Sequence, residues 1–114
     1  MTPAEELYGR WIEELWAGAQ VAAELVSEDF VGHWPHRDVH GAVELQKIVD
    51  ETHATLADLM FVVEIDPFVD GDLVAARWVG TGVASDGPKR FIGNDILRFA
   101  NGRFVEYWNG TAAA

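Results

Sequence analysis

The segment Lys89–Asn109, KRFIGNDILRFANGRFVEYWN, decides the fold. Apolar and polar side chains alternate on both sides of Asn101-Gly102, and a period of two is typical of β-strands. Asn-Gly between two such runs is a strong signal for a tight hairpin turn. We therefore expect strands over 89–100 and 103–109, joined antiparallel at this turn.

The same period extends toward the N-terminus. It predicts strands over 61–70 and 73–84, with turns at Asp70-Gly71-Asp72 and Ser85-Asp86-Gly87-Pro88. Pro67 predicts a bend or bulge in the first of these strands. Four strands joined by short turns form an antiparallel meander.

The first half of the chain has helical spacing instead. Thr2-Pro3-Ala4-Glu5 is a capping box that begins a helix ending at Gly18. Further helices are expected over 19–26 and 42–57. Between them we expect a turn at 27–29, a short strand at 30–34 and a loop at 35–38, and the tail 110–114 is expected to fray.

Three N-terminal helices on one side of a curved antiparallel sheet make an α+β fold. We expect a single domain over residues 1–114 in which a cone-shaped sheet and the helices enclose an apolar pocket. The length suits one domain and 49% of the residues are apolar, which is enough to build such a core.

Composition excludes several classes of function. The net charge of −11 argues against nucleic acids and anionic membranes as partners. The chain has no cysteine, so disulfides and thiolate chemistry are excluded. No apolar run is long enough to span a bilayer and no signal pattern is present, so we expect a cytoplasmic protein. No cofactor motif occurs, and we expect no cofactor.

Asp95 is the first candidate for chemistry. Alternation places it on one face of its strand with Phe91, Gly93, Leu97 and Phe99. A carboxylate on an apolar face is costly, and burial there should raise its pKa. Two interpretations remain open: a functional acid/base group, or a structural aspartate that accepts a hydrogen bond from a core His or Trp.

His33 is the second candidate, in the short strand expected to border the pocket. An imidazole can act as a base near neutral pH. The alternative is a core histidine bonded to the backbone or to Asp95. His33, His36 and His40, with Asp38, do not have a standard metal-ligand spacing, and Pro35 excludes a helix through them, so we expect no metal site.

Aromatic side chains are expected mainly in the core. Trp78 is the one best placed to line a cavity, because the glycines at 80 and 82 leave room beside it. In the last strand, the register decides whether Tyr107 or Trp108 points inward. If Tyr107 and Asn109 face inward, Trp108 lies on the outer face, where it could serve a dimer contact.

Four stretches carry a family resemblance: Asp29–Pro35 (DFVGHWP), Asp58-Leu59, Val69–Trp78 (VDGDLVAARW), and Gly93–Phe99 with Gly102–Trp108. Together they resemble the SnoaL-like branch of the nuclear-transport-factor-2-like superfamily over essentially the whole chain. The resemblance implies the α+β fold, an apolar small-molecule ligand and a homodimer. Because one superfold hosts many functions, it specifies the fold more closely than the activity.

Within this superfamily, Asp95 matches the acid position of ketosteroid isomerase and of SnoaL-type polyketide cyclases. The isomerase's general base falls close to His33 and its oxyanion tyrosine at Trp11. The resemblance therefore implies Asp95 and His33 as catalytic residues. The residues that it implies for substrate binding are Trp11, Trp34, Ile48, Thr52, Trp78, Phe91, Leu97, Tyr107 and Asn109.

Two functions remain open at this point. The first is a cofactor-free isomerase or cyclase that moves a proton next to the carbonyl of an apolar substrate. The second is a non-catalytic module for small-molecule binding or dimerisation. The second is favoured by the segment Gly80–Ala84, which lacks the histidine that SnoaL-type cyclases commonly carry there. The cavity and the His33–Asp95 distance distinguish the two.

Overall fold

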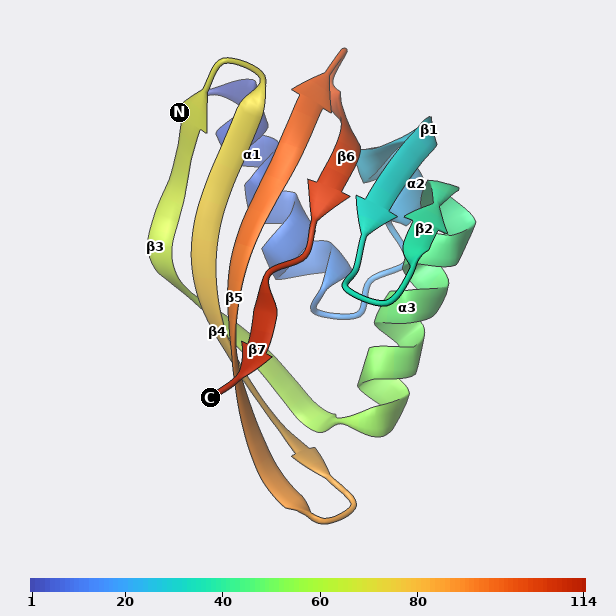
Figure 1. Cartoon of the computed structure of the whole chain (residues 1–114), viewed down its shortest axis with the longest axis vertical. Helices are drawn as coiled ribbons and strands as arrows, with labels where there is room; N and C mark the ends of the chain where they lie inside the picture. The colour runs from blue at the N-terminus through green and yellow to red at the C-terminus, as the bar shows by residue number, and fades with distance from the viewer.

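The computed structural model describes all 114 residues as an α+β fold (Figure 1). The helices are α1 (Pro3–Arg10), which continues into the π-helical turn η1 (Trp11–Leu15), α2 (Ala22–Leu25) and α3 (Gly41–Thr55). The strands are β1 (Val26–His33), β2 (Asp38–His40), β3 (Ala57–Asp70), β4 (Leu73–Ala84), β5 (Gly87–Ala100), β6 (Arg103–Trp108) and β7 (Thr111–Ala113).

The strands form one curved, unclosed sheet in the order β2-β1-β6-β5-β4-β3, with β7 paired to β5 beyond the end of β6. The meander β3-β4-β5-β6 is antiparallel as predicted. The sheet as a whole is mixed, because β1 runs parallel to β6. The predicted curved sheet is confirmed, with β1–β6 as its one parallel pair. Parallel neighbours need a long connection, and here β2, α3 and the meander separate the two strands along the chain.

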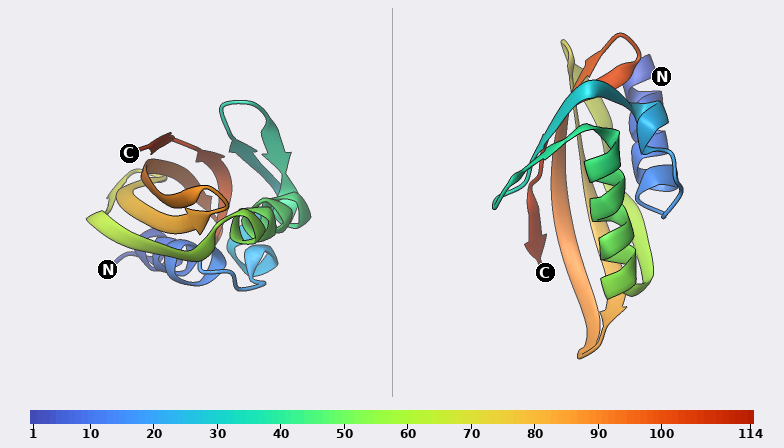
Figure 2. Two further views of the ribbon diagram at one scale, coloured as in Figure 1. Left: turned by 90° about the horizontal axis from the view of Figure 1, so that it is seen from below. Right: turned by 90° about the vertical axis from the view of Figure 1, so that its right-hand side faces the viewer.

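All helices lie on one face of the sheet, and the long strands β3, β4 and β5 curve around them (Figure 2). This arrangement confirms the predicted separation of helices and sheet. None of the helices has the length and apolar character that a membrane crossing requires.

Local sequence signals account for most of the elements. The hydroxyl of Thr2 accepts a hydrogen bond from the backbone N–H of Glu5, and the Glu5 carboxylate accepts one from the N–H of Thr2, so the capping box is formed. The pairing register of β3 shifts between Ile65 and Phe68, the segment that contains Pro67, which confirms the predicted irregularity. The hairpin turn forms at Asn101-Gly102, where both residues have positive φ, of 53° and 81°.

Three local expectations need correction. The polar residues 27–29 belong to β1 rather than to a turn, and Asp38, expected in a loop, begins β2 (Asp38–His40). The tail is ordered as β7, in which Ala112 pairs with Ile92 of β5. β1 pairs with the distant strand β6 and β7 with β5, and short-range hydrophobic alternation does not reveal such pairing.

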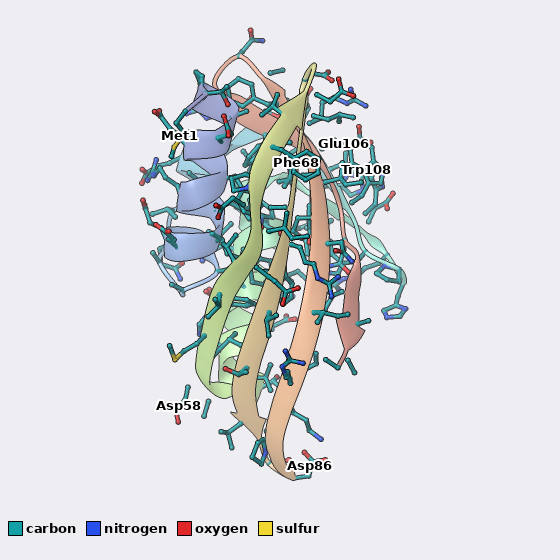
Figure 3. The ribbon with its side chains drawn as sticks, turned by 90° about the vertical axis from the view of Figure 1, so that its left-hand side faces the viewer. Met1, Asp58, Phe68, Asp86, Glu106 and Trp108 are labelled. Carbon is teal, nitrogen blue, oxygen red and sulfur yellow. The ribbon has the colours of Figure 1, made fainter.

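The outer face of the sheet carries an apolar row. Phe68, Ala75, Ile96 and Trp108 lie opposite one another in successive strands from β3 to β6. Phe68 and Ile96 are 58% and 43% exposed. Figure 3 shows Trp108 on the side of the sheet away from α1. This row is where the predicted homodimer contact would form, and the homodimer stays a prediction.

Candidate functional site

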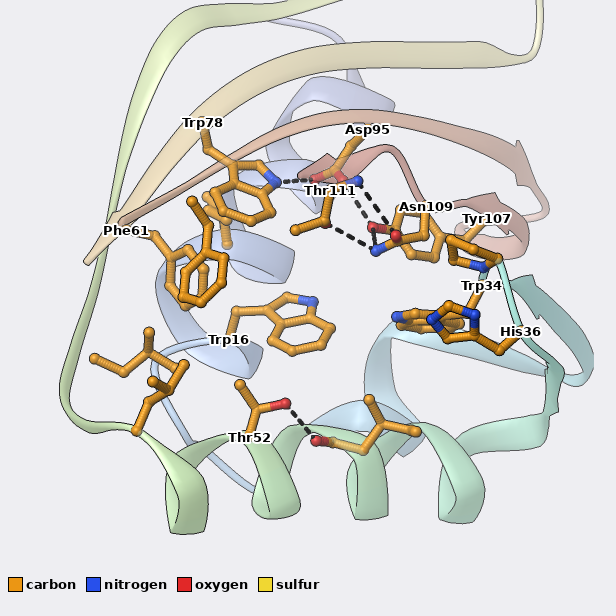
Figure 4. A pocket seen from close by; sticks show the side chains of 16 residues that line it. Trp16, Trp34, His36, Thr52, Phe61, Trp78, Asp95, Tyr107, Asn109 and Thr111 are labelled. Carbon is orange, nitrogen blue, oxygen red and sulfur yellow. Dashed lines mark hydrogen bonds between the residues drawn. The ribbon is translucent and has the colours of Figure 1, made fainter. Parts of the chain in front are cut away.

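A cavity of about 320 Å³ lies between the helices and the concave face of the sheet (Figure 4). Its lining is drawn from almost every element: Ile12 and Trp16 from the first helix and its end, Ile48 and Thr52 from α3, Phe61 from β3, Trp78 from β4, Phe91 and Asp95 from β5, and Tyr107 from β6. Trp34, Pro35 and His36 of the β1–β2 loop line it as well, with Leu56, Leu59, Asn109 and Thr111. Ten of the sixteen lining residues are hydrophobic, and none is Lys or Arg, so a ligand would meet a mostly apolar wall.

Asp95 is the one charged residue buried in the protein, with 1% of its surface exposed. It lies on the inner face of β5 because Gly93, Asp95 and Leu97 alternate with the exposed Asn94 and Ile96. This confirms the inward orientation that the period of two predicts. The carboxylate forms part of the cavity wall.

Three side chains donate hydrogen bonds to the Asp95 carboxylate. The Tyr8 hydroxyl and the Trp78 indole N–H reach Oδ2 at 2.9 and 3.0 Å, and the Tyr107 hydroxyl reaches Oδ1 at 2.8 Å. A carboxylate has about four acceptor positions. Three of them are filled by α1, β4 and β6, so one position on Oδ1 stays available.

Gly93 allows the Trp78 indole to reach Asp95. The two residues pair across β4 and β5, and a Cβ atom at Gly93 would overlap the indole ring, including the nitrogen that donates to Asp95. Only glycine therefore fits beneath the ring in its present position. Gly80 has a similar but looser relation to the same indole, 3.0 Å from its Cζ3 atom to an added Cβ.

A second set of hydrogen bonds fixes the Tyr107 side of the site. The Asn109 Nδ2 group donates to the Tyr107 hydroxyl at 3.1 Å and to the Thr111 hydroxyl at 3.0 Å. Because the Tyr107 hydroxyl accepts from Asn109, its own proton is directed to Asp95. Tyr107 and Asn109 thus face inward, as expected, and Trp108 faces outward.

Burial raises the pKa of Asp95, while the hydrogen bonds from Tyr107, Tyr8 and Trp78 act in the opposite direction. Burial and the neighbouring Asp95 charge also raise the pKa values of Tyr8 and Tyr107, so both phenols stay protonated donors. Asp95 is therefore the group of this cluster whose pKa is displaced toward neutrality.

The structure does not bring His33 to Asp95. Residues Phe30 and Gly32 of β1 point inward, so His33 lies on the outer face. Its Nδ1 is 3.0 Å from Asp38 Oδ1 and its Nε2 is 2.7 Å from Glu106 Oε2. These carboxylates, Glu106 first, raise the pKa of His33. The predicted pairing of His33 with Asp95 is thus wrong, and His33 joins β1, β2 and β6 instead.

Two expected ligand contacts are core residues. Trp11 is fully buried and packs against Phe30, Phe104 and Tyr107, with ring centroids 5.0 to 6.3 Å apart. Leu97 is also fully buried and does not line the cavity. Their side chains fill the space behind the cavity wall, so the expectation that they line it is wrong.

Tyr8 was missed by the sequence reasoning. The resemblance suggested a tyrosine at the position of Trp11. Tyr8 lies three residues earlier on the same helix face, so a hydroxyl one helical turn away was the signal for it. The other expected ligand residues, Trp34, Ile48, Thr52, Trp78, Phe91, Tyr107 and Asn109, do line the cavity. Their contact with a ligand stays a prediction.

The family model described as a SnoaL-like domain matches residues 8–107. A search of curated proteins finds no match to the chain.

Solved structures with the same fold are numerous. A candidate SnoaL-like polyketide cyclase from Jannaschia sp. CCS1 superposes with a TM-score of 0.82 at 20% identity, over 93% of this chain and 83% of that one. IdmH from Streptomyces antibioticus, a candidate polyketide cyclase, gives 0.78 at 22% identity over 99% and 92%. An NTF2-like protein of unknown function from Exiguobacterium sp. 255-15 gives 0.76 at 20% identity over 93% and 98%. At these identities the similarity shows the fold.

Proposed function

The chain belongs to the SnoaL-like domain family, and from that premise we propose that it is a cofactor-free acid/base enzyme for an apolar, carbonyl-containing small molecule. Asp95 is its proton-transfer group, and the reaction class is isomerisation or ring closure by proton transfer next to the carbonyl. The description of two of its structural neighbours as candidate polyketide cyclases agrees with this class.

One observation carries the proposal: the only buried carboxylate of the chain forms part of the wall of an otherwise apolar cavity. Apolar walls with a few polar groups are typical of small-molecule sites, and a displaced pKa is typical of acid/base residues. Burial displaces the pKa of Asp95 in the direction that makes a carboxylate a better base.

The free position on Oδ1 gives the proton a place to go. The C–H bond next to the carbonyl breaks, its proton moves to Asp95, and its electron pair forms the enolate. A neutral Asp95 needs fewer donors than the anion, so the Tyr107 hydroxyl becomes available to the enolate oxygen. The proton then returns to another carbon atom of the same molecule, which completes an isomerisation without a second acid.

The test is hydrogen exchange at the α-carbon of a panel of cyclic ketones in D₂O, followed by NMR. We expect the wild-type chain to accelerate exchange and Asp95→Asn to lose at least ~10²-fold, the range typical of a lost general base. Thr55→Val is the matched control, because Thr55 also donates its hydroxyl to a backbone carbonyl of α3, that of Glu51, but lies outside the cavity. Equal exchange by wild type and Asp95→Asn would overturn the proposal.

A non-catalytic binding module is the second candidate. It is favoured by the three hydrogen bonds that already hold Asp95, and by the position of His33 outside the cavity. It predicts that cyclic ketones quench the fluorescence of the cavity tryptophans without any accelerated exchange.

A further inference from the structure

The cavity combines one buried carboxylate with aromatic walls and no cationic side chain. Its aromatic members are Trp16, Trp34, Phe61, Trp78, Phe91 and Tyr107. The hydrogen-bond donors that hold Asp95 are all uncharged. In its ionised form Asp95 is therefore a buried negative charge without a positive partner, and buried charges are normally paired.

Neighbouring rings of the cavity stand nearly at right angles. Trp16 and Phe61 have an interplanar angle of 71°, Phe61 and Trp78 one of 87°, and Trp34 and Tyr107 one of 69°. Their centroids are 5.0 to 6.2 Å apart. The two rings of each pair therefore differ steeply in orientation. Cations are attracted to aromatic faces, most strongly to tryptophan.

The hydrogen-bond capacity near Asp95 points in the same direction. The Trp78 N–H and the hydroxyl protons of Tyr8 and Tyr107 are used on the carboxylate, and the Asn109 amide protons are used on Tyr107 and Thr111. What remains at Asp95 is an acceptor position on Oδ1. Together with a net charge of −11 for the chain, this arrangement disfavours anionic ligands.

From these observations we propose that the cavity binds a small apolar amine as its ammonium ion, with the positive charge beside Asp95 and among the aromatic rings. The ligand is a tertiary or quaternary ammonium compound with a hydrocarbon body. This goes beyond the proposed proton transfer, since it depends on the charge of Asp95 and on the rings rather than on catalysis. A cavity of about 320 Å³ is at the lower end of the range for such ligands.

Proton linkage follows from this geometry. A bound cation favours ionised Asp95, so affinity for a permanent cation should rise as the pH rises through the pKa of Asp95. Tyr8 and Tyr107 are the titratable groups that face Asp95, and both stay protonated over this range. His36 is the remaining titratable side chain of the cavity wall.

The test compares phenyltrimethylammonium with its uncharged isostere tert-butylbenzene by tryptophan fluorescence and NMR titration. We expect the wild-type chain to bind the cation at least ~10-fold more tightly, as a desolvated cation–π and ion-pair site should. Asp95→Asn should bring the two affinities to within ~2-fold, and Thr55→Val, on the exposed part of α3 outside the cavity, should keep the preference. His36→Gln should keep the rise in affinity with pH.

Four outcomes would each overturn this inference: tighter binding of tert-butylbenzene, equal binding of the two probes, binding of neither, or an unchanged preference in Asp95→Asn.

Tyr107→Phe provides a second test if Asp95→Asn does not fold. This variant leaves the charge of Asp95 in place, so the preference for the cation should persist. Ketone exchange without a cation preference would remove this inference alone. A cation preference without exchange would remove the proton-transfer proposal alone.

Discussion

The hydroxyl of Tyr8 donates a 2.9 Å hydrogen bond to Oδ2 of Asp95 and so connects the first helix to the fifth strand, across 87 residues of sequence. Both side chains are buried. The other two donors to this carboxylate, Trp78 and Tyr107, come from strands β4 and β6. It links the packing of the N-terminal helix directly to the protonation of the site.

Replacing Tyr8 with Phe should affect both properties. A hydrogen bond to a charged group contributes roughly 1.5–3 kcal/mol, so we expect Tyr8→Phe to lower the free energy of unfolding by about this amount. Because this bond lowers the pKa of Asp95, its loss should raise that pKa further. Urea unfolding measures the first effect and the carboxyl ¹³C shift of Asp95 the second; an unchanged ¹³C titration would contradict the linkage.

Asp95 should make the stability of the protein depend on pH. Its folded-state pKa is raised above the unfolded value near 3.8, so the folded state binds more protons between the two values. Stability from this group is therefore greatest below about pH 3.8 and declines as the pH rises through the folded pKa. We expect wild type to lose stability relative to Asp95→Asn over this window, in urea titrations at a series of pH values. A difference that is constant with pH would show that Asp95 titrates alike in both states.

His33 should make the stability of the protein depend on pH in the same direction as Asp95. Its folded pKa is raised above the ordinary value of 6.5 by Glu106 and Asp38. The contribution of His33 to the free energy of unfolding is complete below about pH 6.5, and it is lost as the pH rises through the folded-state pKa. Since its side chain is 33% exposed, the effect should stay below about 1 kcal/mol.

His33→Gln should remove this pH dependence. Ketone exchange should not respond to this variant, because His33 lies outside the cavity. A loss of ketone exchange in His33→Gln would contradict the position of His33 outside the functional site.

Gly93→Ala should displace the Trp78 indole, because the added methyl group overlaps the ring. We expect a loss of about 1–3 kcal/mol of stability, as for other overpacked positions. The Trp78 indole N–H resonance should also move when its bond to Asp95 breaks. Gly9→Ala is the matched control: nothing lies within 4 Å of its added Cβ, and in helix α1 it should stabilise by about 0.5–1 kcal/mol. An unshifted Trp78 resonance in Gly93→Ala would contradict this account.

We propose that a second copy of the chain covers the outer row of Phe68, Ala75, Ile96 and Trp108. An apolar row across four strands is a surface that monomers seldom leave open. Ile96→Lys should then convert a dimer to a monomer in analytical ultracentrifugation, whereas Val43→Lys, on the exposed surface of α3, should not. A monomeric wild type would refute the dimer.

The strands and the burial of Asp95 could be predicted because both follow from alternation along a single segment. Side-chain direction along a strand has a period of two, so the inward position of Asp95 needs only its neighbours. For the last strand alternation left the register open, and it was the family resemblance that placed Tyr107 inside. Alternation from the inward-facing Phe30 also predicts that His33 faces outward. The family resemblance instead suggested an inward position for His33.

The remaining features depend on long-range contacts. The parallel pairing of β1 with β6 joins residues more than seventy positions apart. Neither segment contains a sequence pattern that identifies the other as its partner. Strand β7 contains Thr and Ala, without apolar alternation, and is held by its backbone bonds to β5. The contact of Tyr8 with Asp95 was missed because it depends on which face of the first helix packs against β5.

The first helix continues into the π-helical segment Trp11–Leu15, where the N–H of Trp16 bonds to the carbonyl of Trp11. A π turn holds one residue more than an α turn, and this places Trp16 beside Trp11, with ring centroids 6.3 Å apart. The segment therefore accommodates one extra residue in the helix, and this sets the directions in which Tyr8 and Trp16 point around the helix axis. If the same residues continued as an ordinary α-helix, Trp16 would be rotated by about 100° relative to Tyr8. The hydroxyl at Asp95 and the indole in the cavity wall could then no longer face the sheet together.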